Sequence, residues 1–303
     1  MLSFSLRHGS SSLHLADFGG RGPTILLCHG LGGSHANFVA LGPMLAERAR
    51  VLALDLPGFG LSPPAKNCDL DAHVAAVGRV ADAIRSGEIE GASAPLILIG
   101  NSMGGAVSIL TASRRAHDVA KVVLVCPALP QRSVFDLDRR FGLLLGVAMM
   151  PGYDTVFRRR MLSAGPEAMV HELLNICCVD KNRVPPSAIV AMVELAKKRT
   201  MFSWLASSFS QSARSIVMTL FRKDAFRAAM RAVRAPVLLV HGARDRLVPV
   251  AAAHAAREVC PSWMLEIYDD IGHVPQLEAP DRLAASIFRF LESGEQVTAA
   301  AHP

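Results

Sequence analysis

Short apolar runs alternate along this 303-residue chain with longer stretches of helical spacing. Six runs of four or five residues are largely apolar without alternation, which is typical of parallel strands covered on both faces. Between them, apolar positions recur every three or four residues, which predicts helices. The expected strands are 24–28, 51–54, 96–99, 122–126, 237–240 and 264–268, and the expected helices are 37–48, 70–85, 103–116, 251–259 and 281–291.

The alternating order of these elements predicts an α/β fold built on one mostly parallel sheet. Right-handed crossovers would place the helices on both faces of that sheet. Two polar–apolar alternations, at 3–6 and 11–16, predict a further antiparallel hairpin at one edge.

This order is interrupted between residues 130 and 234. The interval has helical spacing, is rich in Met and Phe, and carries 17 Lys and Arg against 8 Asp and Glu. We therefore expect a core made of 1–129 and 235–293, an inserted helical lid at 130–234, and a flexible tail at 294–303. The lid segments 141–150 and 201–221 are apolar enough to face a hydrophobic cavity, although a plain helical core has the same composition.

Composition narrows the class of protein. At 51% hydrophobic residues the chain can fill a large core, and its N-terminus lacks the apolar stretch of a signal peptide, so we expect a cytoplasmic protein. The six cysteines follow no metal-ligand spacing, which predicts buried free thiols, with no metal and no cofactor. Basic residues are not interleaved with aromatic ones, so no nucleic-acid partner is expected.

Ser102 lies between glycines directly after an apolar run, in the stretch LILIGNSMGG. A serine hydroxyl attacks a carbonyl carbon only when it is exposed, next to a base, and close to donors for the oxyanion. A sharp strand-to-helix turn meets these needs, and it requires Gly100 and Gly104 because it brings the residues on either side of the serine together. The backbone N–H groups of Leu31, in HGLGG, and of Met103 are the predicted oxyanion hole.

Two later strands end in a candidate acid and a candidate base. Asp245 lies in a turn after the run at 237–240, and His273 follows the run at 264–268. Active groups in open α/β sheets gather at the carboxyl ends of the strands, so Ser102, Asp245 and His273 are expected to converge there as a catalytic triad.

Five motifs in this order resemble the α/β-hydrolase superfamily, in its branch of lid-bearing serine esterases, lipases and C–C hydrolases. They are HGLGG at 29–33, DLPGFGLS at 55–62, GNSMGG at 100–105, GARD at 242–245 and GH at 272–273. The similarity covers about residues 20–129 and 234–293, and it implies a mostly parallel, eight-stranded sheet with helices on both faces and an inserted helical lid.

The resemblance also assigns roles to residues. It places the nucleophile, acid and base at Ser102, Asp245 and His273, and the oxyanion donors at Leu31 and Met103. His29 matches a residue that supports the oxyanion loop, and the stretch from Asp55 to Ser62 matches a structural turn. Haloalkane dehalogenases and epoxide hydrolases of this fold use an aspartate as nucleophile, so the serine argues against both.

The leading expectation is a carboxylesterase or lipase that acts on a small hydrophobic ester through an acyl-enzyme. The basic lid suggests peripheral contact with anionic lipid, although a solvated basic surface has the same composition. The alternative is a C–C hydrolase of ring-cleavage products, whose acidic substrates suit a positively charged pocket. A non-catalytic binding protein, or a cofactor-free oxygenase or peroxidase, would keep the same fold. The sequence does not indicate an oligomeric state.

Overall fold

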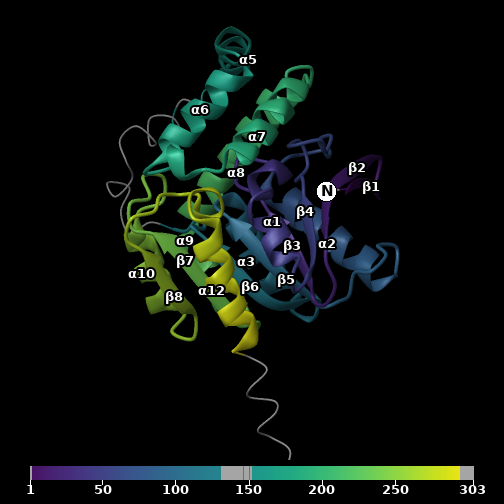
Figure 1. Cartoon of the computed structure of the whole chain (residues 1–303), viewed down its shortest axis with the longest axis vertical. Helices are drawn as coiled ribbons and strands as arrows, with labels where there is room; N and C mark the ends of the chain where they lie inside the picture. Colours follow the sequence, from purple (N-terminus) through teal and green to yellow (C-terminus); the bar gives the residue numbers. More distant parts are fainter. Residues whose placement is uncertain (1, 131–145, 147–149, 151, 294–303) are drawn as a thin grey trace, which may run out of the picture.

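One eight-stranded sheet forms the centre of the computed structural model, which describes residues 2–130, 146, 150 and 152–293 (Figure 1). The strand order is β1-β2-β4-β3-β5-β6-β7-β8. All pairs from β4 to β8 are parallel, whereas β1–β2 and β2–β4 are antiparallel, which confirms the predicted sheet and its edge hairpin. The strands are β1 (Leu2–His8), β2 (Ser11–Gly19), β3 (Thr24–Cys28), β4 (Arg50–Leu54), β5 (Leu96–Asn101), β6 (Val119–Val125), β7 (Val237–Gly242) and β8 (Met264–Tyr268).

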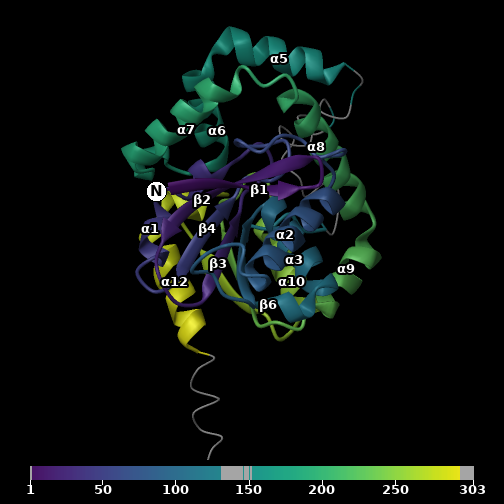
Figure 2. The same ribbon diagram turned by 90° about the vertical axis from the view of Figure 1, so that its right-hand side faces the viewer.

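Every residue of β3, β4 and β5 is buried because helices cover both faces of the sheet. Successive strand residues point to opposite faces. Leu26 and Leu98 share a core cluster with residues of α2 (Leu70–Arg85) and α3 (Met103–Arg114). Leu27 and Ile99 share the other cluster with α1 (Leu41–Leu45) and α12 (Pro280–Glu292) (Figure 2). The unbroken apolar runs of the sequence therefore belong to the layer between two helical layers.

The helix predicted at 37–48 is wrong in its extent. The structure has a 3₁₀ turn, η1 (His35–Phe38), followed by the short helix α1. Pro43 has no N–H to donate to the carbonyl of Val39, so a continuous helix through this segment would lose a hydrogen bond. The capping box of Ser34 and Asn37 starts the turn early instead.

The other predicted core helices agree with the structure to within two residues. The helix predicted at 251–259 is α10 (Val250–Val259). Two further short elements of the core, η2 (Ala116–Asp118) and α11 (Pro275–Glu278), were not predicted. All six cysteines are buried and free, as expected. Among the described residues, no helix has both the length and the apolar character needed to cross a membrane.

Helices α5 to α9 lie between β6 and β7 in the chain, inside the predicted lid at 130–234. They are α5 (Tyr153–Ala164), α6 (Pro166–Cys177), α7 (Pro186–Arg199), α8 (Leu205–Phe221) and α9 (Lys223–Ala232), with the 3₁₀ turn η4 (Lys181–Arg183) after α6. Figure 1 shows α5, α6 and α7 standing on one end of the sheet domain. Most of the predicted apolar segment 141–150 and all of the predicted tail 294–303 lie outside the described residues.

Polar side chains hold α8 against the core. The hydroxyl of Ser212 donates to the carbonyl of Cys68 over 2.5 Å and lies 2.9 Å from Nε2 of His73. Since this hydroxyl uses its proton on Cys68, it accepts from His73, and Nδ1 of His73 is left buried without a partner among the residues that the structure describes. Gln211 and Ser215 accept backbone N–H groups from the same loop of the core.

Candidate active site

Ser102 has a backbone conformation that L-residues rarely adopt, with φ 54° and ψ −117°. It lies between the end of β5 and the start of α3, and it is partly exposed while Asn101 and Met103 are buried. A Cβ on Gly100 would lie 2.2 Å from the carbonyl oxygen of Gly104, and a Cβ on Gly104 would lie 2.1 Å from that of Cys28. The two glycines are therefore required by the turn, and the strain is concentrated at the residue whose hydroxyl must be presented.

Backbone hydrogen bonds fix this turn on both sides. The N–H of Ser102 donates to Val125 over 3.1 Å, and its carbonyl accepts from Gly105, Ala106 and Ala128. Met103 is the first residue of α3, so its N–H has no partner within the helix. This N–H is therefore available to a negatively charged oxygen next to Ser102.

His273 and Asp245 are in direct contact. Nδ1 of His273 donates to Oδ2 of Asp245 over 2.7 Å, and both side chains are buried. Oδ1 of Asp245 accepts the backbone N–H groups of Leu247 (2.8 Å) and Val248 (2.9 Å). The proton on Nδ1 leaves Nε2 with a lone pair, which is the form that a general base needs.

Burial opposes the charge of Asp245, yet its pKa lies below the ordinary aspartate value. The positive charge that His273 can carry, its hydrogen bond, and the neighbouring His241 and Val248 together lower that pKa. The carboxylate is therefore ionised at neutral pH and can stabilise an imidazolium.

Asn101 connects the serine turn to the loop that carries the histidine. Its side-chain Nδ2 donates to the carbonyl of His273 and to that of Val125, each over 3.0 Å. Within the described residues the hydroxyl of Ser102 makes no hydrogen bond to His273. Catalytic hydrogen bonds are often long before substrate binds, so this geometry leaves the pair as a candidate. Sequence reasoning missed Asn101, because the second position of G-x-S-x-G accepts many residue types.

The loop with Leu31 passes directly beside Ser102. A Cβ on Gly30 would lie 3.1 Å from the Cβ of Ser102, so the backbone of this loop touches the nucleophile turn. The loop folds back on itself through a hydrogen bond from Gly33 to Gly30. In the part of the chain that the structure describes, the N–H of Leu31 has no acceptor. The loop thus brings a second available donor to the neighbourhood of Ser102.

His29 supports this loop through a hydrogen bond to Gly30, and Asp55 contacts the residues that follow the loop. Nε2 of His29 accepts from Leu56 over 3.0 Å, so Nδ1 carries the proton and donates to the carbonyl of Gly30 over 2.7 Å. Burial lowers the pKa of His29 to about 4, which keeps the ring neutral. Asp55 is fully buried and accepts from Nδ1 of His14 (2.9 Å), Nδ1 of His35 (2.8 Å) and the backbone of Leu61.

Two buried groups in the described residues contain ligand-type atoms close together: His14, His35 and Asp55, and Cys126, His241 and Asp245. In the first group the nearest imidazole nitrogens already donate to the carboxylate, so they have no lone pair for a metal ion. In the second, Nε2 of His241 donates to the carbonyl of Val248 over 2.8 Å. Hydrogen bonding therefore accounts for the imidazole nitrogens nearest the carboxylates in both groups, whereas Nδ1 of His241 is buried without a partner among the described residues.

Comparison with known proteins identifies the family for most of the chain. A family model described as the alpha/beta hydrolase fold matches residues 23–280. The chain is 27% identical over 286 residues to the pimeloyl-[acyl-carrier protein] methyl ester esterase of Methylococcus capsulatus, covering 90% of this chain and 96% of that protein. It is 26% identical over 281 residues to the 2-hydroxymuconate semialdehyde hydrolase of Pseudomonas sp. CF600, covering 91% and 89%.

A solved structure gives the same result. The crystal structure of a bacterial membrane phospholipase A superposes with a TM-score of 0.72 at 27% identity, covering 96% of this chain and 86% of that one. The residues matched by the family model include strands β3 to β8, the serine turn and the loops that carry Asp245 and His273. The chain therefore belongs to the family of proteins with the alpha/beta hydrolase fold.

Proposed function

We propose that this chain is a serine hydrolase that cleaves carboxylic esters of hydrophobic acyl groups, with Ser102 as nucleophile, His273 as base and Asp245 as the acid that orients it. The observation that carries the proposal is the 2.7 Å hydrogen bond from His273 to Asp245, because it sets the imidazole in its basic form. The strained backbone of Ser102 and the hydrogen bond from Asn101 to the carbonyl of His273 support the proposal, because they join the serine turn to the loop of the histidine.

The reaction would proceed through an acyl-enzyme. Nε2 of His273 takes the proton of Ser102 as the hydroxyl oxygen attacks the ester carbonyl, and Asp245 stabilises the imidazolium that forms. The N–H groups of Leu31 and Met103 bind the oxyanion. His273 then gives its proton to the leaving alcohol, and water activated by the same ring releases the acid.

An aromatic cluster beside the oxyanion loop supports a hydrophobic acyl group. Tyr153 and Phe157 of α5 and Phe209 of α8 have ring centroids 5.3 to 6.1 Å apart, and they pack with Leu31. A Cβ on Gly32 would lie 3.2 Å from the ring of Phe209. The inserted helices thus place an apolar wall directly next to the predicted oxyanion donor.

A panel of p-nitrophenyl esters from acetate to palmitate tests this function. We expect turnover that rises from acetate toward longer acyl chains, and we expect Ser102→Ala to lose it. Equal rates for all chain lengths would contradict the hydrophobic acyl site. Turnover that survives in Ser102→Ala would contradict the role of Ser102 as nucleophile.

Hydrolysis of an acidic ring-cleavage product is the second candidate, supported by the similarity to the 2-hydroxymuconate semialdehyde hydrolase. Arg199, at the end of α7, favours it. Nη1 of Arg199 donates to the carbonyl of Gly32 over 3.1 Å, and its Nε is buried without an acceptor among the described residues. A half-buried guanidinium beside the oxyanion loop suits a carboxylate. Hydrolysis of such a product can be followed by the loss of its visible absorbance. A higher rate for this product than for any ester in the panel would favour this function over ester hydrolysis.

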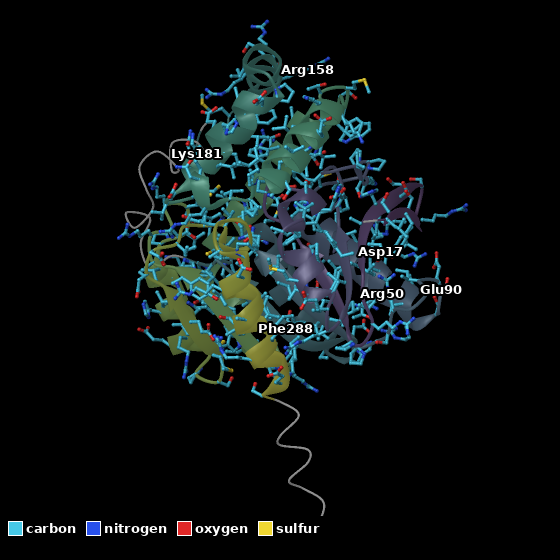
Figure 3. The ribbon with its side chains drawn as sticks, in the orientation of Figure 1. Asp17, Arg50, Glu90, Arg158, Lys181 and Phe288 are labelled. Carbon is cyan, nitrogen blue, oxygen red and sulfur yellow. The ribbon has the colours of Figure 1, made fainter. Side chains whose placement is uncertain are left out.

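We also propose that the helices of the lid touch anionic lipid. Val156, Met201 and Phe221 expose more than 60% of their surface. Arg158 to Arg160, close to Val156 in α5, are exposed as well, and Figure 3 shows Arg158 at the end of the inserted helices that is far from the sheet. Apolar and basic side chains together favour an anionic membrane surface. Co-sedimentation with phosphatidylserine vesicles should exceed that with phosphatidylcholine vesicles and should fall with salt. Equal binding to both, or none, would contradict it.

A further inference from the structure

Glu278 is a buried carboxylate with no basic partner. It is the last residue of the short helix α11, five residues after His273, and only 3% of its surface is exposed. Among the described residues, no Lys, Arg or His lies within ion-pair distance of it. A buried charge without a cation must be stabilised by hydrogen bonds.

Three backbone N–H groups supply that stabilisation, and they come from two distant segments. Oε2 accepts from Gly272 over 2.9 Å. Oε1 accepts from Val179 over 2.9 Å and from Asp180 over 2.8 Å. Gly272 directly precedes His273, whereas Val179 and Asp180 follow the C-cap residue of α6, Cys178. One carboxylate therefore binds the loop of the predicted base and the end of an inserted helix at the same time.

The two segments are also in backbone contact. A Cβ on Gly272 would lie 2.3 Å from the carbonyl oxygen of Cys177, so only a glycine allows this approach. The N–H of His273 donates to the same carbonyl over 2.7 Å. The backbone of His273 is thus held at its N–H by the end of α6 and at its carbonyl by Asn101.

We propose that Glu278 is a positioning residue for His273. Through its carboxylate, the position of the imidazole depends on the position of the C-terminal end of α6. This inference rests on the function proposed above, in which His273 is the base. The carboxylate does not touch the substrate. It fixes the peptide before His273, and the ring can meet both Asp245 and Ser102 only if that peptide stays in place.

The substitution Glu278→Gln tests this dependence with little change of shape. A glutamine keeps one oxygen acceptor, but its NH₂ group would face an N–H of Gly272 or of Val179 and Asp180, which are all donors. It also removes the charge that strengthens the remaining hydrogen bonds. One of the two segments is therefore released.

We expect Glu278→Gln to lower kcat for the best ester by roughly 10- to 100-fold, with KM within about threefold of wild type, because small misplacements of a reacting group cost rate more than binding. The downfield NMR resonance of the proton between His273 and Asp245 should broaden or disappear. A purely structural role would move neither this resonance nor the kcat of the folded fraction.

Asp118→Asn is the matched control. Asp118 is also a buried carboxylate, 1% exposed, and it accepts from Nε of Arg115, but it precedes β6 at the amino end of the sheet, away from the end where Ser102 lies. We expect it to lower stability and to leave kcat per folded molecule and the His273 resonance unchanged. A kcat loss in Asp118→Asn equal to that in Glu278→Gln would overturn the proposal.

Val179→Pro changes the donor side of the same contact. It is the alternative test if Glu278→Gln does not fold. It removes one donor to Glu278, and Cys178 already has φ −96° and ψ 151°, which a following proline allows. We expect a smaller loss of kcat in the same direction. Wild-type kcat and an unchanged resonance in either variant would refute the role of Glu278. Absence of ester turnover in the wild-type protein would refute the proposed function instead, and the resonance would still report on Glu278.

Discussion

Replacing Asp245 with asparagine should move the ring proton of His273 from Nδ1 to Nε2 while leaving the fold intact. Oδ1 of Asp245 accepts two backbone N–H groups, from Leu247 and Val248, so the amide oxygen of an asparagine must take that place. Its NH₂ group then faces Nδ1 of His273, where Oδ2 now accepts over 2.7 Å. Because two donors cannot pair, the ring must move its proton to Nε2, and it then has no lone pair for Ser102.

The size of the effect follows from what is lost. The variant lacks the tautomer that accepts the serine proton, and it also lacks the negative charge that stabilises the imidazolium. In a Ser-His-Asp triad this change lowers kcat by about 10⁴-fold, which corresponds to about 5 kcal/mol in the activation free energy. We expect KM to change little, since Asp245 does not face the substrate.

The assay is kcat and KM for the best p-nitrophenyl ester, with a thermal unfolding curve to show that the variant is folded. Nitrogen-15 NMR of the histidine rings reports the tautomer directly. A folded Asp245→Asn protein that keeps more than a tenth of the wild-type kcat would refute the role of Asp245. So would a His273 ring that still carries its proton on Nδ1.

Three further predictions concern the turn, the acyl wall and the buried histidines. Gly104→Ala should abolish soluble, active protein, because its Cβ would lie 2.1 Å from a backbone oxygen; normal yield and thermal unfolding would contradict the strained turn. Phe209→Ala should lower kcat/KM for long acyl esters by about 10-fold or more and for acetate by less than about threefold, as measured on the ester panel; an equal loss on both would remove the acyl wall. Burial lowers the pKa of His29 to about 4 and of His73 to about 3, so both rings stay neutral in the native state while those of the unfolded chain take up protons below about 6.5. The contribution of each neutral ring to the free energy of unfolding is therefore fully present above about pH 6.5 and is lost as the pH falls toward the pKa of the native state. Urea unfolding should show a loss of about 2 kcal/mol for each ring between pH 7 and 5. The folded variant His73→Asn should show about 2 kcal/mol less of this loss, and an unchanged pH dependence would refute the neutral state of His73.

The fold could be predicted from the sequence because each core element carries its own local signal. The run at Thr24–Cys28 and the helix at Leu70–Arg85 match the structure residue for residue. In both segments the hydrophobic pattern is long enough to distinguish a strand from a helix and to indicate which residues are buried. The helix expected at 37–48 failed because a single missing donor, the nitrogen of Pro43, outweighs the apolar spacing around it.

The residues that place the candidate site could be predicted only in part. Ser102, Asp245 and His273 follow strands, and the sheet order brings strand ends together, so their neighbourhood follows from topology. The contacts of Asn101 with His273 and of Glu278 with Val179 join residues 172 and 99 positions apart. Nothing in the local sequence around either residue indicates its partner, since the partner groups are backbone atoms that every residue has.

The rate at which a fluorophosphonate probe modifies the protein, with the modified peptide identified by mass spectrometry, tests whether His273 activates the hydroxyl of Ser102. We expect a single adduct on Ser102 in the wild-type protein, and a rate at least about 100-fold lower in His273→Ala, because the hydroxyl is activated only by that imidazole. A wild-type protein that stays unmodified at Ser102, or that reacts equally fast without His273, would contradict this activation.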